Sequence, residues 1–163
     1  MGAVFPSFRE ASGGKELLVF KLNDQRYGLS LSAVERVIRM VEIAALHHAP
    51  ESVLGLVNIE GEIVPVFDIR RRFGHESLAA DPDHQLILAR TSKRRVALAV
   101  DRTLGVETAS PGSAVDADEI SLPHLNHVAG VVKHPDGMIF IHDLESFLST
   151  EEGTALDAAL SQI

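Results

Sequence analysis

The stretch at residues 55–74, GLVNIEGEIVPVFDIRRRFG, constrains the fold more than any other part of the chain. Two apolar, β-branched runs flank Glu60 and Gly61, a pair typical of a tight turn, so the stretch predicts a β-hairpin. Asp68 ends the second run and precedes apolar residues at helical spacing. We therefore predict strand, turn and strand, followed by an aspartate that caps one short helical turn.

The same pattern returns at residues 130–148, GVVKHPDGMIFIHDLESFL. Three landmarks of the first copy have counterparts in the second: Gly55 with Gly130, Gly61 with Gly137, and Asp68 with Asp143. A further pair of apolar runs precedes each copy, within residues 17–31 and 85–100. We therefore predict an internal duplication of about 70 residues, against the alternative that two hairpins are alike by chance.

Composition favours a compact globular protein. The 163 residues are 45% apolar, which suffices for one core or for two small cores that share an interface. No apolar run approaches the roughly 18 residues of a membrane span, and residues 1–14 lack the apolar segment of a signal peptide, so a soluble cytoplasmic protein is expected. The net charge of −8 argues against non-specific nucleic-acid binding. We interpret the basic clusters at residues 70–72 and 93–95 as solvated surface.

The eight histidines invite a catalytic or metal-binding hypothesis, but their spacing does not support it. His47 and His48 are adjacent, and His124 and His127 have no glutamate partner at helical spacing. Cysteine is absent, which removes disulfides, thiolate metal sites and a cysteine nucleophile. No nucleotide-binding glycine motif and no nucleophile elbow occurs. We predict no catalytic residue, no metal and no cofactor; a hydrolase or metalloprotein that uses the histidines is the alternative from another class.

Three stretches together resemble the CheW family, the adaptor proteins of bacterial chemosensory arrays. They are residues 55–74 and 130–148, quoted above, and LLVFKLNDQRYGLSLSAVERVIR at residues 17–39. The last of these matches the family's opening, whereas residues 130–148 match its closing hairpin and helix. The resemblance covers about residues 16–160 without a receiver or kinase domain, so the chain is similar to the stand-alone adaptor.

The resemblance implies a mainly β fold of two packed, five-stranded SH3-like β-barrels with short helices and a C-terminal helix. We expect residues 1–14 to form a flexible leader and residues 15–160 to form a single CheW-like domain. Within this domain, the first barrel is expected at residues 15–80, the second at residues 83–148, and the C-terminal helix at residues 149–161.

The resemblance also implies a non-catalytic scaffold that couples chemoreceptors to the histidine kinase CheA in a bacterial chemotaxis array. Its partners would be the regulatory domain of CheA and the cytoplasmic tip of a chemoreceptor. Nucleic-acid binding and membrane insertion are not expected, and the protein would be cytoplasmic and recruited to membrane-associated arrays. By position, the receptor-binding residues would be Val34, Gly55, Asn58, Glu60 and Thr103, whereas no kinase-binding residue is assigned. A Gly55→Asp change is expected to weaken receptor docking without unfolding the chain.

Two of these positions depart from the family's usual pattern. Glu60 stands in the turn where many members carry arginine, and Thr103 stands where a small apolar residue is common. A reversed charge at a contact exchanges an attraction for a repulsion unless the partner has changed as well. A partner-matched substitution and an exposed rim position both explain Glu60. The departure also favours an alternative function, a CheW-like adaptor of a dedicated non-flagellar chemosensory pathway with a non-standard receptor partner.

Overall fold

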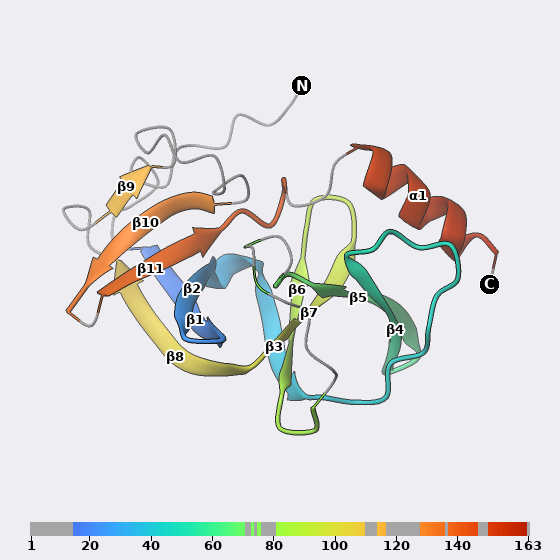
Figure 1. Cartoon of the computed structure of the whole chain (residues 1–163), viewed down its shortest axis with the longest axis horizontal. Helices are drawn as coiled ribbons and strands as arrows, with labels where there is room; N and C mark the ends of the chain where they lie inside the picture. The colour runs from blue at the N-terminus through green and yellow to red at the C-terminus, as the bar shows by residue number, and fades with distance from the viewer. Residues whose placement is uncertain are drawn as a thin grey trace.

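The computed structural model describes residues 15–70, 73, 75, 81–109, 114–116, 128–135, 137–146 and 150–162. Within them lie eleven strands, one 3-10 turn, η1 (Leu31–Ala33), and one helix, α1 (Thr150–Leu160). The strands form two sheets, sheet A and sheet B, and α1 lies on the side of sheet B (Figure 1). The prediction of a mainly β fold is therefore confirmed, whereas the leader at residues 1–14 lies outside the described residues.

Both sheets are built from strands that are far apart in the sequence. Sheet A has the order β8-β1-β2-β11-β10-β9, and sheet B has the order β3-β6-β7-β5-β4. The strands of sheet A are β1 (Lys15–Leu22), β2 (Gln25–Ser30), β8 (Arg102–Ala109), β9 (Ala114–Asp116), β10 (Val128–His134) and β11 (Gly137–His142). The strands of sheet B are β3 (Val34–Arg39), β4 (Val53–Ile59), β5 (Glu62–Asp68), β6 (Gln85–Arg90) and β7 (Arg95–Val100).

The chain does not fill the two sheets one after the other. The hairpin β1–β2 lies in sheet A, but the next three strands, β3, β4 and β5, lie in sheet B. The second half reverses this assignment, because β6–β7 lies in sheet B and the later strands lie in sheet A. The expected division into a first barrel at residues 15–80 and a second at residues 83–148 is therefore wrong. Side-chain pattern predicts which segments become strands, but the ladders join backbone groups that are alike in every residue, so packing decides the partners.

The predicted duplication reappears in the strand register. Each sheet has a hairpin at its centre, β1–β2 or β6–β7, with one antiparallel strand on one side and a second hairpin paired in parallel on the other. The parallel pair Val66–Ala97 of sheet B corresponds to Ile141–Gly28 of sheet A. Bulges also recur, since the register shifts after Val34 in β3 and after Thr103 in β8. The two halves therefore share one order of elements.

Strand β9 has a counterpart in sheet B as well. It pairs with β10 through Val115 and Val131, whereas Ala44 forms an isolated bridge with Leu56 of β4. Both pairings add a short segment to the outer edge of the second hairpin. Apart from these short segments, each sheet has the five strands that were predicted.

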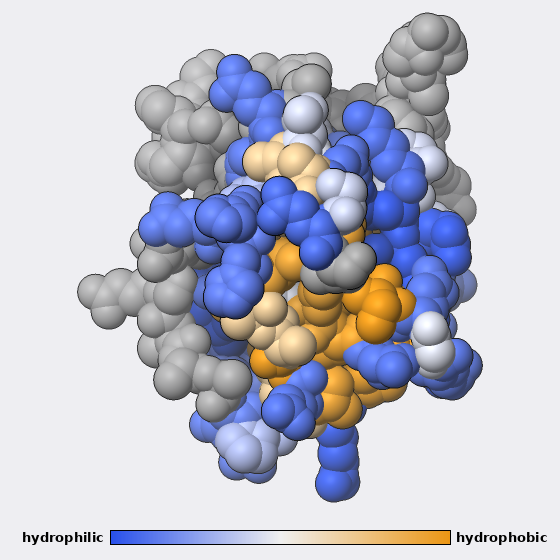
Figure 2. Space-filling model, turned by 90° about the vertical axis from the view of Figure 1, so that its right-hand side faces the viewer, coloured by the Kyte–Doolittle hydropathy of each residue, from blue (hydrophilic) through white to orange (hydrophobic). Residues whose placement is uncertain are grey.

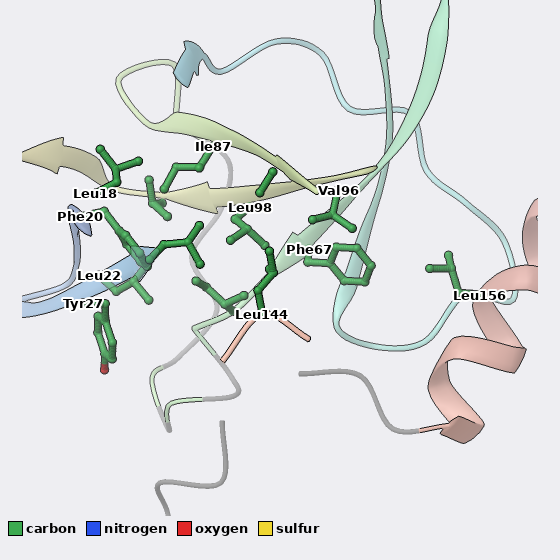
Figure 3. Close-up of a cluster of buried hydrophobic side chains, with 14 residues drawn as sticks. Leu18, Phe20, Leu22, Tyr27, Phe67, Ile87, Val96, Leu98, Leu144 and Leu156 are labelled. Carbon is green, nitrogen blue, oxygen red and sulfur yellow. The ribbon is translucent and has the colours of Figure 1, made fainter. Parts of the chain in front are cut away.

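Apolar side chains fill three layers, because the central strands are apolar on both faces and successive residues point to opposite sides. One buried cluster belongs to sheet A alone, and it contains Leu17, Val19, Ala109, Val132, Ile139 and Ile141. A second belongs to sheet B alone, and it contains Val57, Ile59, Val64, Val66, Leu86, Leu88, Ala97 and Ala99. The middle layer joins both sheets (Figure 3), with Leu18, Phe20, Leu22 and Tyr27 from sheet A and Phe67, Ile87, Val96 and Leu98 from sheet B. The sequence-based expectation of small cores that share an interface is met by this arrangement.

Helix α1 follows the last strand of sheet A but packs against sheet B. Its Leu156 is fully buried and belongs to the same cluster as Phe67 of β5 (Figure 3). Ser52 Oγ donates to Glu152 Oε2 at 3.2 Å, and Arg94 Nη2 donates to Asp157 Oδ1 at 2.6 Å. The helix predicted at residues 149–161 is thus confirmed. Among the described residues, no helix combines the length and the apolar character that crossing a membrane requires.

A buried ionic cluster ties the end of β5 to the corner between β7 and β8. The Arg70 guanidinium contacts Asp101 Oδ1 and lies 3.6 Å from Asp68 Oδ1, and the Arg70 and Asp68 side chains are only 3% and 2% exposed. Asp101 Oδ2 also accepts a hydrogen bond from the Asn23 amide at 2.8 Å. Asp68 caps the backbone as predicted, because its Oδ1 accepts from the Arg70 amide at 3.0 Å. The interpretation of Arg70 as solvated surface is wrong, because two carboxylates compensate its burial.

Candidate functional site

The tip of the β4–β5 hairpin is a tight turn at Glu60 and Gly61. Ile59 pairs with Glu62 across it, and the φ angles of Glu60 and Gly61 are 53° and 90°. Positive φ at both central positions is typical of the type I′ turn, whose twist matches that of the flanking strands. Asn58 Oδ1 accepts a hydrogen bond from the Gly61 amide at 2.8 Å. Asn58 therefore shapes the turn while it remains exposed.

Glu60 forms an ion pair within the chain. Arg36 Nη2 of β3 donates to Glu60 Oε1 at 2.6 Å, and the two side chains are 45% and 73% exposed. This contact holds the start of β3 beside the hairpin tip, although β3 and β4 stand at opposite ends of the strand order. Sheet B is therefore curled so that its two edges approach each other.

Arg95 reinforces this closure from the centre of the sheet. It donates to Glu35 Oε2 of β3 at 2.7 Å and to Glu62 Oε2 of β5 at 2.9 Å. Burial alone would lower the pKa of Arg95, but the hydrogen bonds and charges of Glu35 and Glu62 raise it. The guanidinium stays charged and links three strands at the end that carries the turn.

Figure 2, which shows the right-hand side of Figure 1, contains an apolar area bordered by hydrophilic side chains. The exposed large apolar side chains of the β4–β5 hairpin are Leu54 and Ile63, which are 38% and 49% exposed, and Val41, shortly after β3, is 43% exposed. Ile63 stands directly opposite Asn58 in the ladder, and residues in such a pair share one face of the sheet. Leu54 is the extra residue where the register shifts between Val53 and Gly55. An apolar area bordered by charges is typical of protein-docking surfaces.

We call these residues the hairpin surface: Arg36, Val41, Leu54, Asn58, Glu60 and Ile63. Sequence reasoning did not single out Val41, Leu54 or Ile63. Ile63 belongs to a continuous apolar run, Ile63 to Phe67, that is typical of a buried strand. The sequence nevertheless indicated that some side chains of this run are exposed. Successive side chains of a strand point to opposite faces, so a run beside a polar turn places alternate side chains on the solvent-exposed face of the sheet.

Gly55 lies beneath the surface. It is buried with φ of 153°, and a Cβ there would stand 2.2 Å from Ala44 O and 2.8 Å from Ile43 Cγ2. The missing side chain lets residues 43–44 run against β4, where Ala44 and Leu56 exchange backbone hydrogen bonds of 2.9 and 2.7 Å. The expectation that Gly55→Asp leaves the fold intact is therefore wrong, because any side chain would collide with the backbone.

Val34 and Thr103 occupy equivalent places in the two sheets but lie apart. Val34 follows η1, is half-buried against the middle core layer and pairs with Ala89 of β6. Thr103 N and Oγ1 both donate to Gln85 Oε1, at 2.6 and 3.1 Å. Gln85 and Ala89 stand at opposite ends of β6, about 13 Å apart. The structure thus brings Val34, Asn58 and Glu60 to one end of sheet B and places Thr103 elsewhere.

Of the histidines named from the sequence, His47 and His48 are exposed, whereas His124 and His127 lie outside the described residues. No group of three or more histidine, aspartate or glutamate side chains suited to a metal ion occurs in the part of the chain that the structure describes. His75 Nε2 and the Tyr27 hydroxyl share a hydrogen bond of 2.8 Å, and Phe73 stacks on Tyr27 with ring centroids 4.3 Å apart. Burial raises the pKa of Tyr27 to about 12, so the phenol remains protonated at ordinary pH.

A comparison with protein-family models matches residues 16–152 to the CheW-like domain. This chain belongs to the CheW family. The CheW protein of Rhizobium meliloti is 29% identical over 145 residues, which are 88% of this chain and 94% of that protein. The CheW protein of Klebsiella aerogenes is 25% identical over 145 residues, which are 88% and 87% of the two chains.

A solved structure agrees with this assignment. The scaffolding protein CheW of Thermoanaerobacter tengcongensis superposes with a TM-score of 0.77 at 27% identity, over 85% of this chain and 95% of that chain. The CheW family is a non-catalytic scaffold, so the chain is an adaptor of chemotaxis signalling and not an enzyme. Its partners belong to chemotaxis signalling.

Proposed function

We propose that this CheW-family chain couples the cytoplasmic tip of a chemoreceptor to the regulatory domain of CheA, and that it does so in the cytoplasm. The observation that carries the receptor part is the hairpin surface, which combines the exposed Glu60–Arg36 pair with exposed apolar side chains. Affinity would come from Val41, Leu54 and Ile63, and partner choice from the charges.

The five proposed receptor-binding residues act in different ways. Asn58 and Glu60 are exposed and contact the receptor directly, whereas Val34 borders the contact at the start of β3. Gly55 acts indirectly, because it allows residues 43–44 to lie against β4 and so shapes the surface. Thr103 serves a separate contact on β8 of sheet A.

Titration calorimetry with a chemoreceptor tip fragment from the same genome tests the proposal. The natural chain should bind, Ile63→Glu should weaken binding at least tenfold, and Glu60→Arg should also weaken it, since it places two arginines side by side. Asp24→Arg, which makes the same charge change at the exposed turn of β1–β2, is the matched control and should bind normally. Unchanged affinity in both hairpin-surface variants would contradict the assignment of the receptor site.

The Glu60–Arg36 pair also favours a second candidate function, an adaptor of a dedicated non-flagellar pathway with a non-standard receptor. A double variant, Arg36→Glu with Glu60→Arg, keeps an ion pair but reverses its polarity. Standard and non-standard receptor tips should therefore prefer opposite polarities. If standard receptor tips bind only the double variant, the result supports the adaptor of a non-flagellar pathway. If they bind the natural chain, the result supports the first candidate function.

A further inference from the structure

The N-terminal and C-terminal halves of the chain are interleaved. Among the described residues, nine strand ladders are formed, and four of them join residues 15–75 to residues 81–142. The four are β1–β8, β2–β11, β3–β6 and β5–β7. Neither half therefore completes a sheet from its own strands.

Core and charged contacts cross between the halves in the same way. The middle core layer combines Phe20 and Phe67 of the first half with Leu98 and Leu156 of the second. Buried Arg70 of the first half contacts Asp101 of the second, and Arg95 of the second contacts Glu35 and Glu62 of the first. Backbone ladders, core packing and ion pairs thus all join one half to the other.

The two halves are connected by the chain only once, between His75 and Asp81. All other contacts between them are non-covalent, so they form equally well when the halves come from different molecules. Six peptide bonds separate His75 from Asp81 and reach at most about 20 Å.

We propose that a second copy of this chain is a partner, bound by exchange of the C-terminal halves. Two chains then form an intertwined dimer that contains two complete folds. Each fold keeps all four crossing ladders, the middle core layer and one hairpin surface. The short connection holds the two folds next to each other, so the dimer presents two hairpin surfaces.

Concentration during folding should decide between the two forms. Within one chain the halves meet at a high effective concentration, so dilute refolding gives the monomer. Refolding at high protein concentration should give a dimer that elutes at twice the mass. This dimer should persist after dilution, because exchange requires all four crossing ladders to open. A dimer that dissociates within seconds of dilution would contradict the proposal.

Complementation between two full-length variants tests the exchange directly. Phe67→Asp damages the middle core layer through the first half, and Leu98→Asp damages it through the second half. Each variant alone should stay unfolded, since a buried unpaired carboxylate is costly. Refolded together, they should form a dimer in which one fold carries neither substitution and the other carries both, so about half of the folded signal returns.

A mixture of Phe67→Asp with Leu18→Asp is the matched control. Both substitutions lie in the first half and in the same core layer, so no exchange produces an intact fold. The chain has a single tyrosine, Tyr27, and no tryptophan, so tyrosinate absorbance measures how many copies are folded. Recovery in the first mixture alone supports the exchange. Equal recovery in both mixtures, or recovery in neither, overturns it.

Discussion

At the scale of single residues, Gly55 allows residues 43–44 to lie against β4, and we propose that it shapes the docking surface without touching a partner. Residues 43–44 pass so close to β4 that only glycine fits. We expect Gly55→Ala to lower the free energy of unfolding by roughly 2–4 kcal/mol, through overpacking and local strain. Urea denaturation measures this change.

Gly61→Ala is the matched control for the change at Gly55. Gly61 also has positive φ, but an added Cβ there meets no atom within 4 Å. It should cost only about 1 kcal/mol, the backbone cost alone. Equal losses in the two variants would show that the contact with Ala44 is unimportant.

Tyr27 provides a prediction at high pH. Its pKa is raised by burial from 10.0 to about 12, so the folded chain holds the phenol proton more tightly than the unfolded chain. This contribution is fully present below pH 10 and is lost as the pH rises towards 12, and it amounts to at most about 3 kcal/mol. Because Tyr27 is the only tyrosine, absorbance near 295 nm titrates it alone. If the Tyr27 phenol of the folded protein were half-ionised near pH 10, the prediction of a raised pKa would be contradicted.

A Tyr27→Phe variant isolates this effect. It loses the hydrogen bond to His75, which costs about 1 kcal/mol at neutral pH. Above pH 10 its stability should fall less steeply than that of the natural chain. Urea midpoints at pH 9 and pH 11.5 compare the two proteins.

At the scale of elements, helix α1 is held to the core chiefly by an apolar side chain. Leu156 is fully buried in the middle core layer, whereas Gly153 lies inside the helix with no atom within 4 Å of an added Cβ. Leu156→Ala should cost roughly 2–5 kcal/mol, because it leaves a cavity. Gly153→Ala should stabilise the fold by about 0.5–1 kcal/mol, since alanine favours the helix. Thermal unfolding followed by circular dichroism measures both; a stable Leu156→Ala variant would mean that α1 is not part of the cooperative fold.

The β4–β5 hairpin was the element that the sequence predicted best. Its length, its turn and the capping role of Asp68 all follow from local rules, because short-range sterics and hydrogen bonds decide them. Its closure against β3 does not follow from them, because the Arg36–Glu60 contact joins residues 24 positions apart. The exposed face of the hairpin surface depends on that closure and was therefore not predictable.

At the scale of the whole molecule, Arg70 connects the two sheets through a buried charge. Arg70→Met would leave Asp68 and Asp101 without their partner, so we expect a loss of roughly 3–5 kcal/mol in the free energy of unfolding. Arg36→Met removes an exposed pair and should cost less than about 1 kcal/mol. Chemical denaturation of both variants makes the comparison, and similar losses would mean that the buried cluster does not stabilise the fold.

The sequence by itself determined the kinds of elements and their repeated order. Turn residues, capping residues and runs of β-branched side chains act over a few positions, so the hairpins, the helix and the duplication could be predicted from them. Glu60 was placed at a turn for the same reason, and the structure puts it there, whereas Asn58 was a candidate only through the family resemblance.

Only the tertiary structure decided which strands pair, and with them the division of the chain between the sheets. Val34 and Thr103 were both receptor-binding candidates, but the structure places them far apart. Val34 pairs with Ala89 near one end of β6, whereas Thr103 is hydrogen-bonded to Gln85 at the other end. Arg70 reads as a surface charge, yet two carboxylates compensate its burial. These outcomes depend on contacts between distant segments, where backbone groups are interchangeable and only the packing of the complete core selects one arrangement.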